Sequence, residues 1–226
     1  MPRIGRAVAP GYPHHVIQRG NNKEHVFFEK EDRKQYLSLL KKYAFKWNSP
    51  IMAYCLMSNH VHLLTKPETN ESLFKMMQGL TLCYTQHINR TYERTGRLWE
   101  SRYHSCIVDH EKYLWAVARY IEQNPVRARM VEKAEDYAYS SAGAHVNGIE
   151  DAVIAVIGED LFGNEGREDY ILLLRSDMPK KEIERLRYAT KTGRPLGSAE
   201  FVVEMEKKLE RRLMQLPKGR PRKKTY

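Results

Sequence analysis

Two short apolar runs separated by two polar residues constrain the fold of this chain more than any other feature. Residues 51–57 (IMAYCLM) and 60–65 (HVHLLT) each have the length and composition of a buried strand. Ser58 and Asn59 between them suit a tight connection, so the runs are predicted to form an antiparallel hairpin. A hairpin this apolar has to be covered, which requires a sheet with other elements packed on it.

Strand and helix patterns on both sides of the hairpin supply that cover. Asp109 is expected to cap a helix that Pro125 ends. The order of strand, helix, two strands, helix, strand and helix predicts an α+β sandwich with an antiparallel sheet. The further strands are expected over residues 12–19 and 101–108, and the helices over 30–47, 71–91 and 110–124.

The pattern weakens after about residue 145, where we predict a small helical appendage. Its helices are expected over residues 150–157, 167–175, 180–189 and 198–213. The predicted parts of the chain are a sandwich domain over 1–145, the appendage over 146–213 and a basic flexible tail over 214–226.

Composition excludes several classes of protein. No apolar run approaches the roughly 20 residues that span a bilayer, and the first residues lack the apolar segment of a signal peptide. The three cysteines are widely spaced and none forms a CxxC motif, so neither a zinc ribbon nor a thioredoxin-like site is indicated. We expect reduced thiols in a cytoplasmic protein without a membrane partner.

Positive charge is concentrated near the C-terminus. The chain has a formal net charge of +10, and residues 179–226 contain 15 Lys and Arg against six Glu, a net charge of +9. Such a segment suits a phosphate backbone, although a solubilising tail is an alternative. A Gly-Arg-Pro core similar to an AT-hook contains Arg220 and lies between Lys218 and Arg222, and a nonspecific polycation explains the same residues.

His60 and His62, which are two residues apart, are the first candidates for a functional site. On a strand, residues two apart point to the same face, where two imidazoles can bind one divalent metal. A hydrogen-bonded histidine pair at a strand edge is the alternative. The apolar flanks favour a metal, because a buried polar group needs a partner.

Tyr120 and Asn124 are four residues apart, on one face of the predicted helix. An amide oxygen can complete a two-histidine metal site, and the tyrosine one turn away would face the same ion. Polarisation of a phosphodiester by a metal, with a nearby base, would help a phenol attack it. The alternative is a partly buried tyrosine and an asparagine that caps the helix before Pro125.

Two longer segments resemble a known family. Leu56–Leu64 (LMSNHVHLL) resembles the signature of single-tyrosine HUH transposases, and Tyr120–Ala128 (YIEQNPVRA) is similar to the nucleophile helix of REP-associated tyrosine transposases. The likeness extends over about residues 10–215. It includes the segments Gln18–Asn22, Gly96–Tyr103, Tyr137–Ser141 and Gly193–Gly197.

The resemblance implies a ferredoxin-like fold with the histidine strand central in its sheet. It implies an enzyme that nicks and rejoins single-stranded DNA at repetitive extragenic palindromes (REP hairpins) through a 5′-phosphotyrosine. Tyr120 would be the nucleophile, and His60, His62 and Asn124 would bind Mg²⁺ or Mn²⁺. The family often has proline where Ser58 stands, and insertion-sequence relatives have glutamine in place of Asn124.

Basic and aromatic residues in these segments are predicted to contact DNA. Arginine suits phosphates and guanine edges, and Trp99 and Tyr103 offer rings for stacking on unpaired bases. Trp99 is equally suited to a core, and Arg102 to an ion pair. The predicted DNA contacts are Arg19, Asn21, Arg97, Trp99, Arg102, Tyr103, Arg127, Arg194, Lys218, Arg220 and Arg222.

Other functions remain open from the sequence. A hairpin-binding regulator with little or no cleavage is the main alternative to the enzyme. A metal-dependent hydrolase that activates water and a basic RNA-binding domain are two more. The family contains dimers with exchanged nucleophile helices, so either a monomer or a homodimer is expected, associated with the nucleoid.

Overall fold

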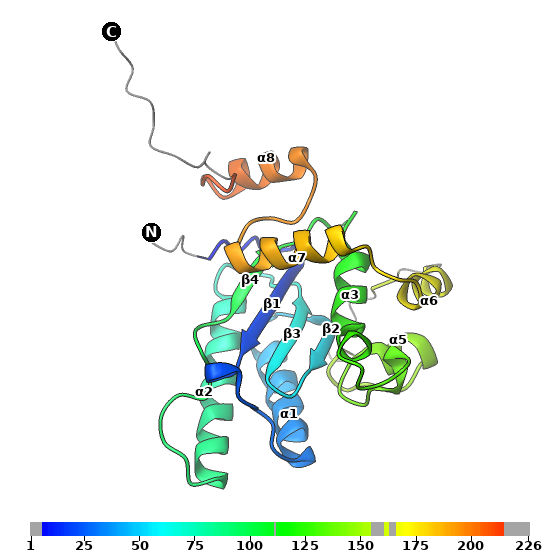
Figure 1. The fold of residues 1–226 in the computed structure, drawn as a ribbon. Coiled ribbons are helices and arrows are strands. Elements are labelled where there is room, and N and C mark those ends of the chain that lie inside the picture. Colours follow the sequence, from blue (N-terminus) through cyan, green and yellow to red (C-terminus); the bar gives the residue numbers. More distant parts are fainter. Residues whose placement is uncertain (1–5, 111, 155–160, 163–165, 215–226) are drawn as a thin grey trace.

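The computed structural model describes residues 6–110, 112–154, 161–162 and 166–214. Its strands and longer helices follow the predicted order up to the end of the fourth strand (Figure 1). The strands are β1 (His14–Arg19), β2 (Ile51–Leu56), β3 (His60–Thr65) and β4 (His104–Ile107), and the intervening helices are α1 (Lys30–Lys46) and α2 (Ser72–Thr91).

The four strands form one antiparallel sheet in the order β2-β3-β1-β4. The hairpin turns at Ser58 and Asn59, where the Met57 N–H donates to the His60 carbonyl at 2.9 Å. Strand β3 therefore lies between β1 and β2, away from both sheet edges. The predicted α+β sandwich and the interior position of the histidine strand are confirmed.

Alternation along the strands divides the core between the two faces of the sheet. On one face, Val61 and Leu63 of β3 pack with apolar side chains of α1 and α2. On the other, Leu64 packs with residues of α3 (Leu114–Glu122) and of α7 (Lys180–Thr192). His60 and His62 have the same parity as Leu64, so they point toward α3 and α7.

Helix α3 begins later than predicted and does not end in the predicted way. Its N-cap is Tyr113 rather than the predicted Asp109, whose backbone carbonyl accepts the Tyr113 N–H at 3.0 Å. Pro125 does not stop the chain from being helical. It stands in the first turn of a short helix, α4 (Asn124–Arg127), where the missing N–H of proline costs nothing.

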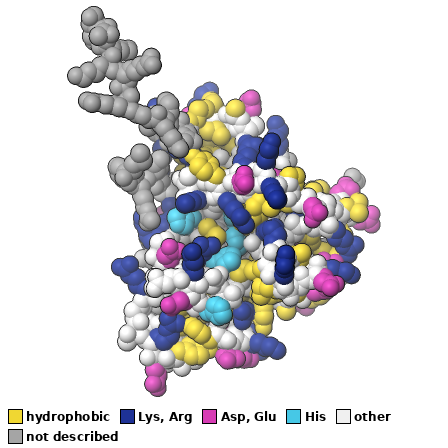
Figure 2. Space-filling view, viewed as in Figure 1, with side chains coloured by type: hydrophobic (Ala, Val, Ile, Leu, Met, Phe, Trp, Pro, Cys, Tyr) yellow, Lys and Arg dark blue, Asp and Glu magenta, His cyan; other side chains and the backbone are white. Residues whose placement is uncertain are grey.

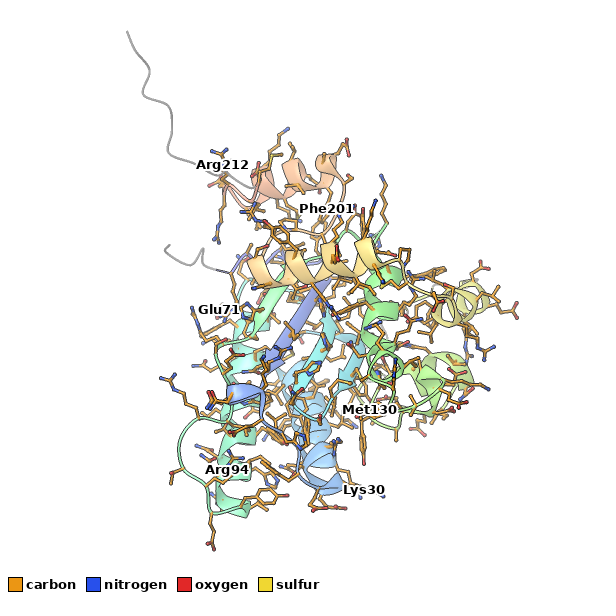
Figure 3. All side chains as sticks on the ribbon, viewed as in Figure 1. Lys30, Glu71, Arg94, Met130, Phe201 and Arg212 are labelled. Carbon is orange, nitrogen blue, oxygen red and sulfur yellow. The ribbon has the colours of Figure 1, made fainter. Side chains whose placement is uncertain are left out.

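The C-terminal helices pack onto the same body. The core that contains Leu64 also contains Leu174, Leu186 and Leu196, so it crosses the predicted boundary at residue 145, which stays a prediction. Phe201 points from α8 toward the body (Figure 3) and packs in a third cluster with Ile107. The remaining helices are α5 (Ala142–Asn147), α6 (Arg167–Arg175) and α8 (Ala199–Lys208).

The structure differs from the predicted helices at two places in this part of the chain. Helix α5 was not predicted, and the helix expected over 150–157 is a turn over 152–154, with 155–157 outside the described residues.

The cysteines Cys55, Cys83 and Cys106 are free thiols. None of the described helices combines the length and apolar character that a membrane crossing requires.

Candidate active site

A cavity of about 770 Å³ opens on the sheet face that α3 and α7 border. Alternate residues of β1 and β3 form its floor, because side chains two apart on a strand share a face. Figure 2 shows histidine side chains gathered in the middle of this face, with Lys and Arg side chains around them. The lining includes His15, Arg19, His60, His62, Tyr120, Asn124, Arg127, Arg187 and Thr190.

The ring of His60 presents a lone pair to the cavity. Its Nδ1 lies 2.6 Å from Oδ1 of Asn59, and an amide oxygen only accepts, so Nδ1 is assigned the proton. The Asn59 amide is oriented by its Nδ2, which donates to the Lys23 carbonyl at 2.9 Å. Nε2 of His60 is thereby left as the unprotonated nitrogen.

His62 lies two residues further along β3, beside His15 of β1. The ring centroids of His60 and His62 are 5.0 Å apart, and the rings of His62 and His15 stack at 5.2 Å. Nδ1 of His62 is 3.0 Å from Nε2 of His15. Nε2 is therefore the nitrogen of His62 that remains for the cavity.

Burial keeps both histidines of β3 neutral. It lowers the pKa of His60 to about 4, with a further contribution from the Arg19 guanidinium. It also lowers the pKa of His62 well below the ordinary value of a histidine. A neutral imidazole carries the lone pair that ligation requires, so neither ring has to lose a proton at neutral pH.

Tyr120 reaches the same cavity from the α3 side. Its ring meets the rings of His15 and His62 edge-on at 5.8 and 5.6 Å, and the Arg127 guanidinium lies 4.4 Å from its centroid. Only 4% of the residue is exposed. Its hydroxyl accepts a hydrogen bond from Nε of Arg187 on α7 at 3.3 Å, which holds the phenol oxygen beside a positive charge.

Asn124 lines the cavity. Both of its amide hydrogens are used, because Nδ2 donates to the carbonyls of Tyr120 and Ile121 at 3.0 Å each. The oxygen is the atom left for a ligand. Arg127 also donates to the Tyr120 carbonyl, so the junction of α3 and α4 is fixed from two sides.

Two imidazole nitrogens and one amide oxygen suit a divalent cation of the Mg²⁺ or Mn²⁺ type. Within the residues that the structure describes, no three His, Cys, Asp or Glu side chains meet to hold a metal. A site of this kind would therefore need a ligand of another type beside the histidine pair, and the amide oxygen of Asn124 is of a suitable type. In donor chemistry, the three predicted ligands fit the ion.

Comparison with known families follows this geometry. The family described as "Transposase IS200 like" matches residues 10–124, a segment that contains His60, His62, Tyr120 and Asn124. The chain belongs to the IS200-like transposase family.

Two relatives of this IS200-like transposase are REP-associated tyrosine transposases. One, from Haemophilus influenzae, is 27% identical over 121 residues; the alignment covers 49% of this chain and 66% of the relative, just under two thirds of its length. The other is a solved structure titled as bound to a REP hairpin, with a TM-score of 0.56 and 17% identity. That match covers 68% of this chain and 90% of the other, and it confirms the fold.

The predicted DNA contacts lie unevenly around the cavity. Arg19 and Arg127 line it, whereas Arg97 and Arg102 are exposed outside its lining. The half-buried Asn21 opens a short 3₁₀ turn (Asn21–Lys23), and its backbone N–H donates to the Leu98 carbonyl. Arg194 donates to the Leu213 carbonyl at 3.4 Å. Lys218, Arg220 and Arg222 lie outside the described residues.

The two aromatic residues predicted to stack on bases lie in packed surroundings in this structure. Trp99 is 8% exposed and packs with Tyr36 and Tyr84 in the core beneath α1 and α2. Tyr103 is 7% exposed, and the guanidinium of Arg6 covers its ring at 3.9 Å. This packing suits the core alternative for Trp99, and the stacking role of both residues stays a prediction.

Sequence reasoning missed three residues of the site: His15, Arg187 and Thr190. His15 has the same strand parity as Arg19, which was predicted to contact DNA, and this shared face was a usable signal for His15. Arg187 and Thr190 stand on an ordinary amphipathic helix and gave none. Only the packing of α7 against β4 and β1 brings them to the histidines.

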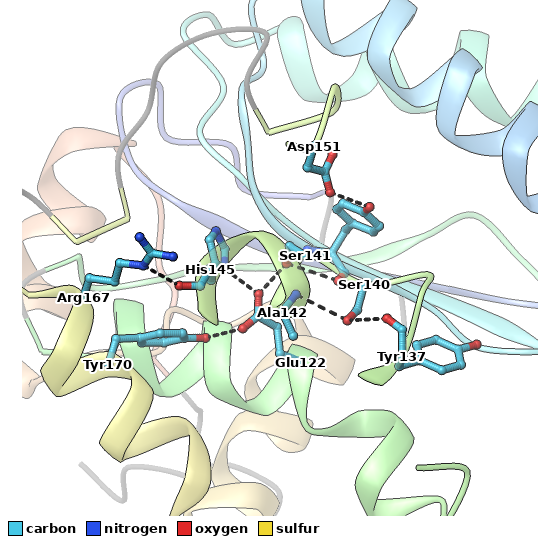
Figure 4. Close-up of polar contacts among 10 residues, drawn as sticks. Glu122, Tyr137, Ser140, Ser141, Ala142, His145, Asp151, Arg167 and Tyr170 are labelled. Atoms are coloured by element: carbon cyan, nitrogen blue, oxygen red, sulfur yellow. Dashed lines mark hydrogen bonds and ion pairs between the residues drawn. The ribbon is translucent and has the colours of Figure 1, made fainter. Parts of the chain in front are cut away.

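Behind the cavity, α3 is anchored by a buried carboxylate (Figure 4). Glu122 is fully buried and accepts hydrogen bonds from Ser141 at 2.5 Å, from Tyr170 at 2.7 Å and, at 2.6 Å, from Nδ1 of His145. Helices α5 and α6 are thus tied to the helix that carries Tyr120. These buried hydrogen bonds add to the apolar packing that holds the three helices together.

Proposed function

We propose that this transposase cleaves and rejoins single-stranded DNA beside REP-type hairpins, with Tyr120 as the nucleophile. The observation that carries the proposal is the meeting of Tyr120 with His60, His62 and Asn124 at one cavity. A protein that only binds DNA does not need a phenol placed against a prepared set of metal ligands. The family and both relatives point to the same chemistry.

The proposed reaction is a transesterification. The phenol oxygen of Tyr120 forms a bond to phosphorus, and the bond from phosphorus to the 3′ oxygen breaks. The products are a 5′-phosphotyrosine and a free 3′ hydroxyl, which in the overall balance gains the phenol proton. Attack by a 3′ hydroxyl on the phosphotyrosine reverses the step and joins strands.

The residues of the cavity divide the work between them. Arg187 holds the Tyr120 oxygen and favours the negative charge that grows there as its proton leaves. His60, His62 and Asn124 would hold Mg²⁺ or Mn²⁺, which when bound withdraws charge from the phosphate. Arg19 and Arg127 offer further positive charge to the strand that enters the cavity.

The substrate is proposed from the structural relative, which is described as bound to a REP hairpin. A basic rim around a histidine floor suits a strand whose phosphate has to reach Tyr120 (Figure 2). Association with DNA of this kind would keep the protein with the nucleoid, as a monomer or a homodimer.

The test is a covalent adduct assay. The full chain is incubated with a labelled single-stranded hairpin from beside its own gene, with Mn²⁺, with Mg²⁺ or with EDTA, and run on a denaturing gel. We expect a shifted band that requires metal and is lost in Tyr120→Phe. Tyr113→Phe is the matched control, because its hydroxyl also accepts from an α7 arginine, Arg185 at 2.6 Å, but lies outside the cavity lining.

The remaining outcomes separate the other functions. Cleaved DNA without an adduct, retained in Tyr120→Phe, would show that water is the nucleophile. Tight hairpin binding with neither cleavage nor adduct in any metal would establish the regulator in place of the enzyme.

A further inference from the structure

We propose that Thr190 of α7 acts through His15 to set the tautomer of His62, so that the unprotonated Nε2 of His62 faces the cavity. Thr190 and His15 are then positioning residues for a proposed metal ligand. The inference rests on the proposed function for its purpose and on the contacts alone for its geometry.

The three side chains form a continuous buried line. Oγ1 of Thr190 lies 3.0 Å from the carbonyl oxygen of Leu186 and 2.7 Å from Nδ1 of His15. Nε2 of His15 lies 3.0 Å from Nδ1 of His62. All three residues are at most 3% exposed, so water does not compete for these hydrogen bonds.

Each of the three side chains carries one proton that can form a hydrogen bond: the hydroxyl proton of Thr190 and one ring N–H proton on each histidine. His15 is 1% exposed, and burial favours the neutral imidazole, which has one N–H and one lone pair. The hydrogen bonds between the side chains can then be ordered from donor to acceptor in two ways. In the first, Thr190 donates to Leu186, His15 to Thr190 and His62 to His15; in the second, each bond between side chains is reversed.

The Leu186 carbonyl selects the first direction, because it can only accept. The single hydroxyl proton of Thr190 is used there, which leaves its oxygen to accept from Nδ1 of His15. Cys106 supports the same arrangement from 3.3 Å: burial raises its pKa to about 12, so the thiol stays protonated and can donate to the second lone pair of Thr190.

The direction decides whether His62 can bind a metal. In the first arrangement Nδ1 of His62 carries the proton and Nε2 is a free lone pair. In the second, Nε2 would carry the proton and would repel a cation. The part of the site within residues 10–124 would thus depend on a helix that lies outside the segment matched by the family.

The first readout is the tautomer itself, in the metal-free protein. Nitrogen-15 correlation spectra of the imidazole rings distinguish a protonated Nδ1 from a protonated Nε2. We expect His62 to carry its proton on Nδ1 in the wild type and in Thr190→Ser, which keeps the hydroxyl. In Thr190→Val the preference is expected to be lost. Thr192→Val is the matched control, because this exposed hydroxyl bonds the Tyr188 carbonyl on the same helix, away from His15.

The second readout is Mn²⁺ affinity, followed by electron paramagnetic resonance without DNA. Thr190→Val is expected to bind Mn²⁺ about tenfold more weakly, the lower end of the range for groups that orient a ligand. Thr190→Ser and Thr192→Val are expected to bind like the wild type.

A wild-type His62 protonated on Nε2 would overturn the proposal, as would a Thr190→Val protein whose tautomer and Mn²⁺ affinity are unchanged. If Thr190→Val does not fold, the wild-type and Thr190→Ser spectra still decide the direction. Failure of the proposed function is separate: the tautomer and the metal affinity would be as expected, while the adduct assay would show no cleavage.

Discussion

The region matched by the family, residues 10–124, and the region after it differ in what they contribute to one site. The first supplies the sheet, the histidine pair, Tyr120 and Asn124. The second adds Arg187 and Thr190, which contact the Tyr120 hydroxyl and His15. The predicted nucleophile and metal ligands therefore lie in the matched segment, whereas two of the side chains that contact this site come from outside it.

Helix α3 joins the two regions. One side of it presents Tyr120 to the cavity, and another buries Glu122 among donors from α5 and α6 (Figure 4). Arg119 adds a third link, with hydrogen bonds to Ser176 at 3.0 Å and to Glu182 of α7 at 3.0 Å. Side chains on one helix thus serve either chemistry or anchoring, and substitutions should separate these two roles.

The largest effect is expected at Tyr120. Tyr120→Phe should lower the cleavage rate by about 10⁴-fold or more, the size of loss seen when a nucleophile is removed. The free energy of unfolding should change by less than about 1 kcal/mol, because the lost hydroxyl accepts only one hydrogen bond, from an exposed arginine. Single-turnover cleavage and urea unfolding measure the two quantities.

Hairpin affinity is the control for that variant, and it should stay within a few-fold of the wild type. A parallel loss of binding and cleavage in Tyr120→Phe would mean that the tyrosine holds DNA rather than attacking it.

Glu122 should show the opposite behaviour. Glu122→Ala leaves the donors of Ser141, His145 and Tyr170 without their buried acceptor, which should lower the free energy of unfolding by about 3 kcal/mol. Chemical denaturation measures this. Glu132→Ala is the control, since Glu132 is an exposed carboxylate and its removal should cost less than about 0.5 kcal/mol.

Glu122→Gln keeps the size and one acceptor oxygen, so its loss of stability should be smaller than that of Glu122→Ala. Equal stability of wild type and Glu122→Ala would show that the carboxylate does not anchor α5 and α6 to α3.

Much of the fold was predictable, because alternation on strands is a strong local signal. The apolar runs 51–57 and 60–65 predicted β2 and β3 to within one residue, and the two-residue spacing placed His60 and His62 on one face. The spacing of Tyr120 and Asn124 also survived the unexpected break between α3 and α4. The second helix starts at once, so the two side chains still line one cavity.

What the sequence did not predict depends on tertiary partners. Asp109 is a residue type that commonly caps helices, but the N-cap of α3 is Tyr113, and the Asp109 carboxylate accepts the distant Ser198 N–H at 3.5 Å. Trp99 stands among arginines in the sequence, yet the fold turns its ring into the core. Arg187 and Thr190 enter the site only because α7 packs across β4 and β1. No local pattern carries information of this kind.

Arg187 should have an intermediate effect, and it tests the contribution of the C-terminal region to chemistry. Arg187→Gln should slow cleavage by about 10²-fold, because a group that stabilises developing charge is lost. Its stability should be close to that of the wild type, since the side chain is exposed. Single-turnover rates at saturating hairpin measure the effect on cleavage.

Arg185→Gln is the matched control for Arg187→Gln. Arg185 stands on the same helix and donates to the hydroxyl of Tyr113, outside the cavity lining. Equal slowing by the two substitutions would point to general loss of positive charge rather than to a contact with Tyr120.

The smallest effect is expected from removal of the basic tail. This deletion should change DNA affinity without changing the cleavage rate, so it separates the two contributions. Residues 1–178 contain 23 Lys and Arg against 22 Asp and Glu, so the region that carries the reactive groups is nearly neutral. Removal of residues 215–226 deletes five basic side chains. Each lost phosphate contact should flatten the slope of log K against log salt by about 0.7 on a single strand. Affinity should fall only a few-fold near physiological salt, and the cleavage rate at saturating DNA should not change.

A tail with the same composition in scrambled order distinguishes the two explanations of the Gly-Arg-Pro run. A polycation acts through its charge, so scrambling should restore both the affinity and the salt slope. An AT-hook requires arginine on an extended Gly-Arg-Pro backbone, so scrambling should restore the slope but not a preference for A·T-rich duplex stems. An unchanged slope on deletion of the tail would mean that it does not contact phosphates, and that the DNA affinity resides in the arginines around the cavity.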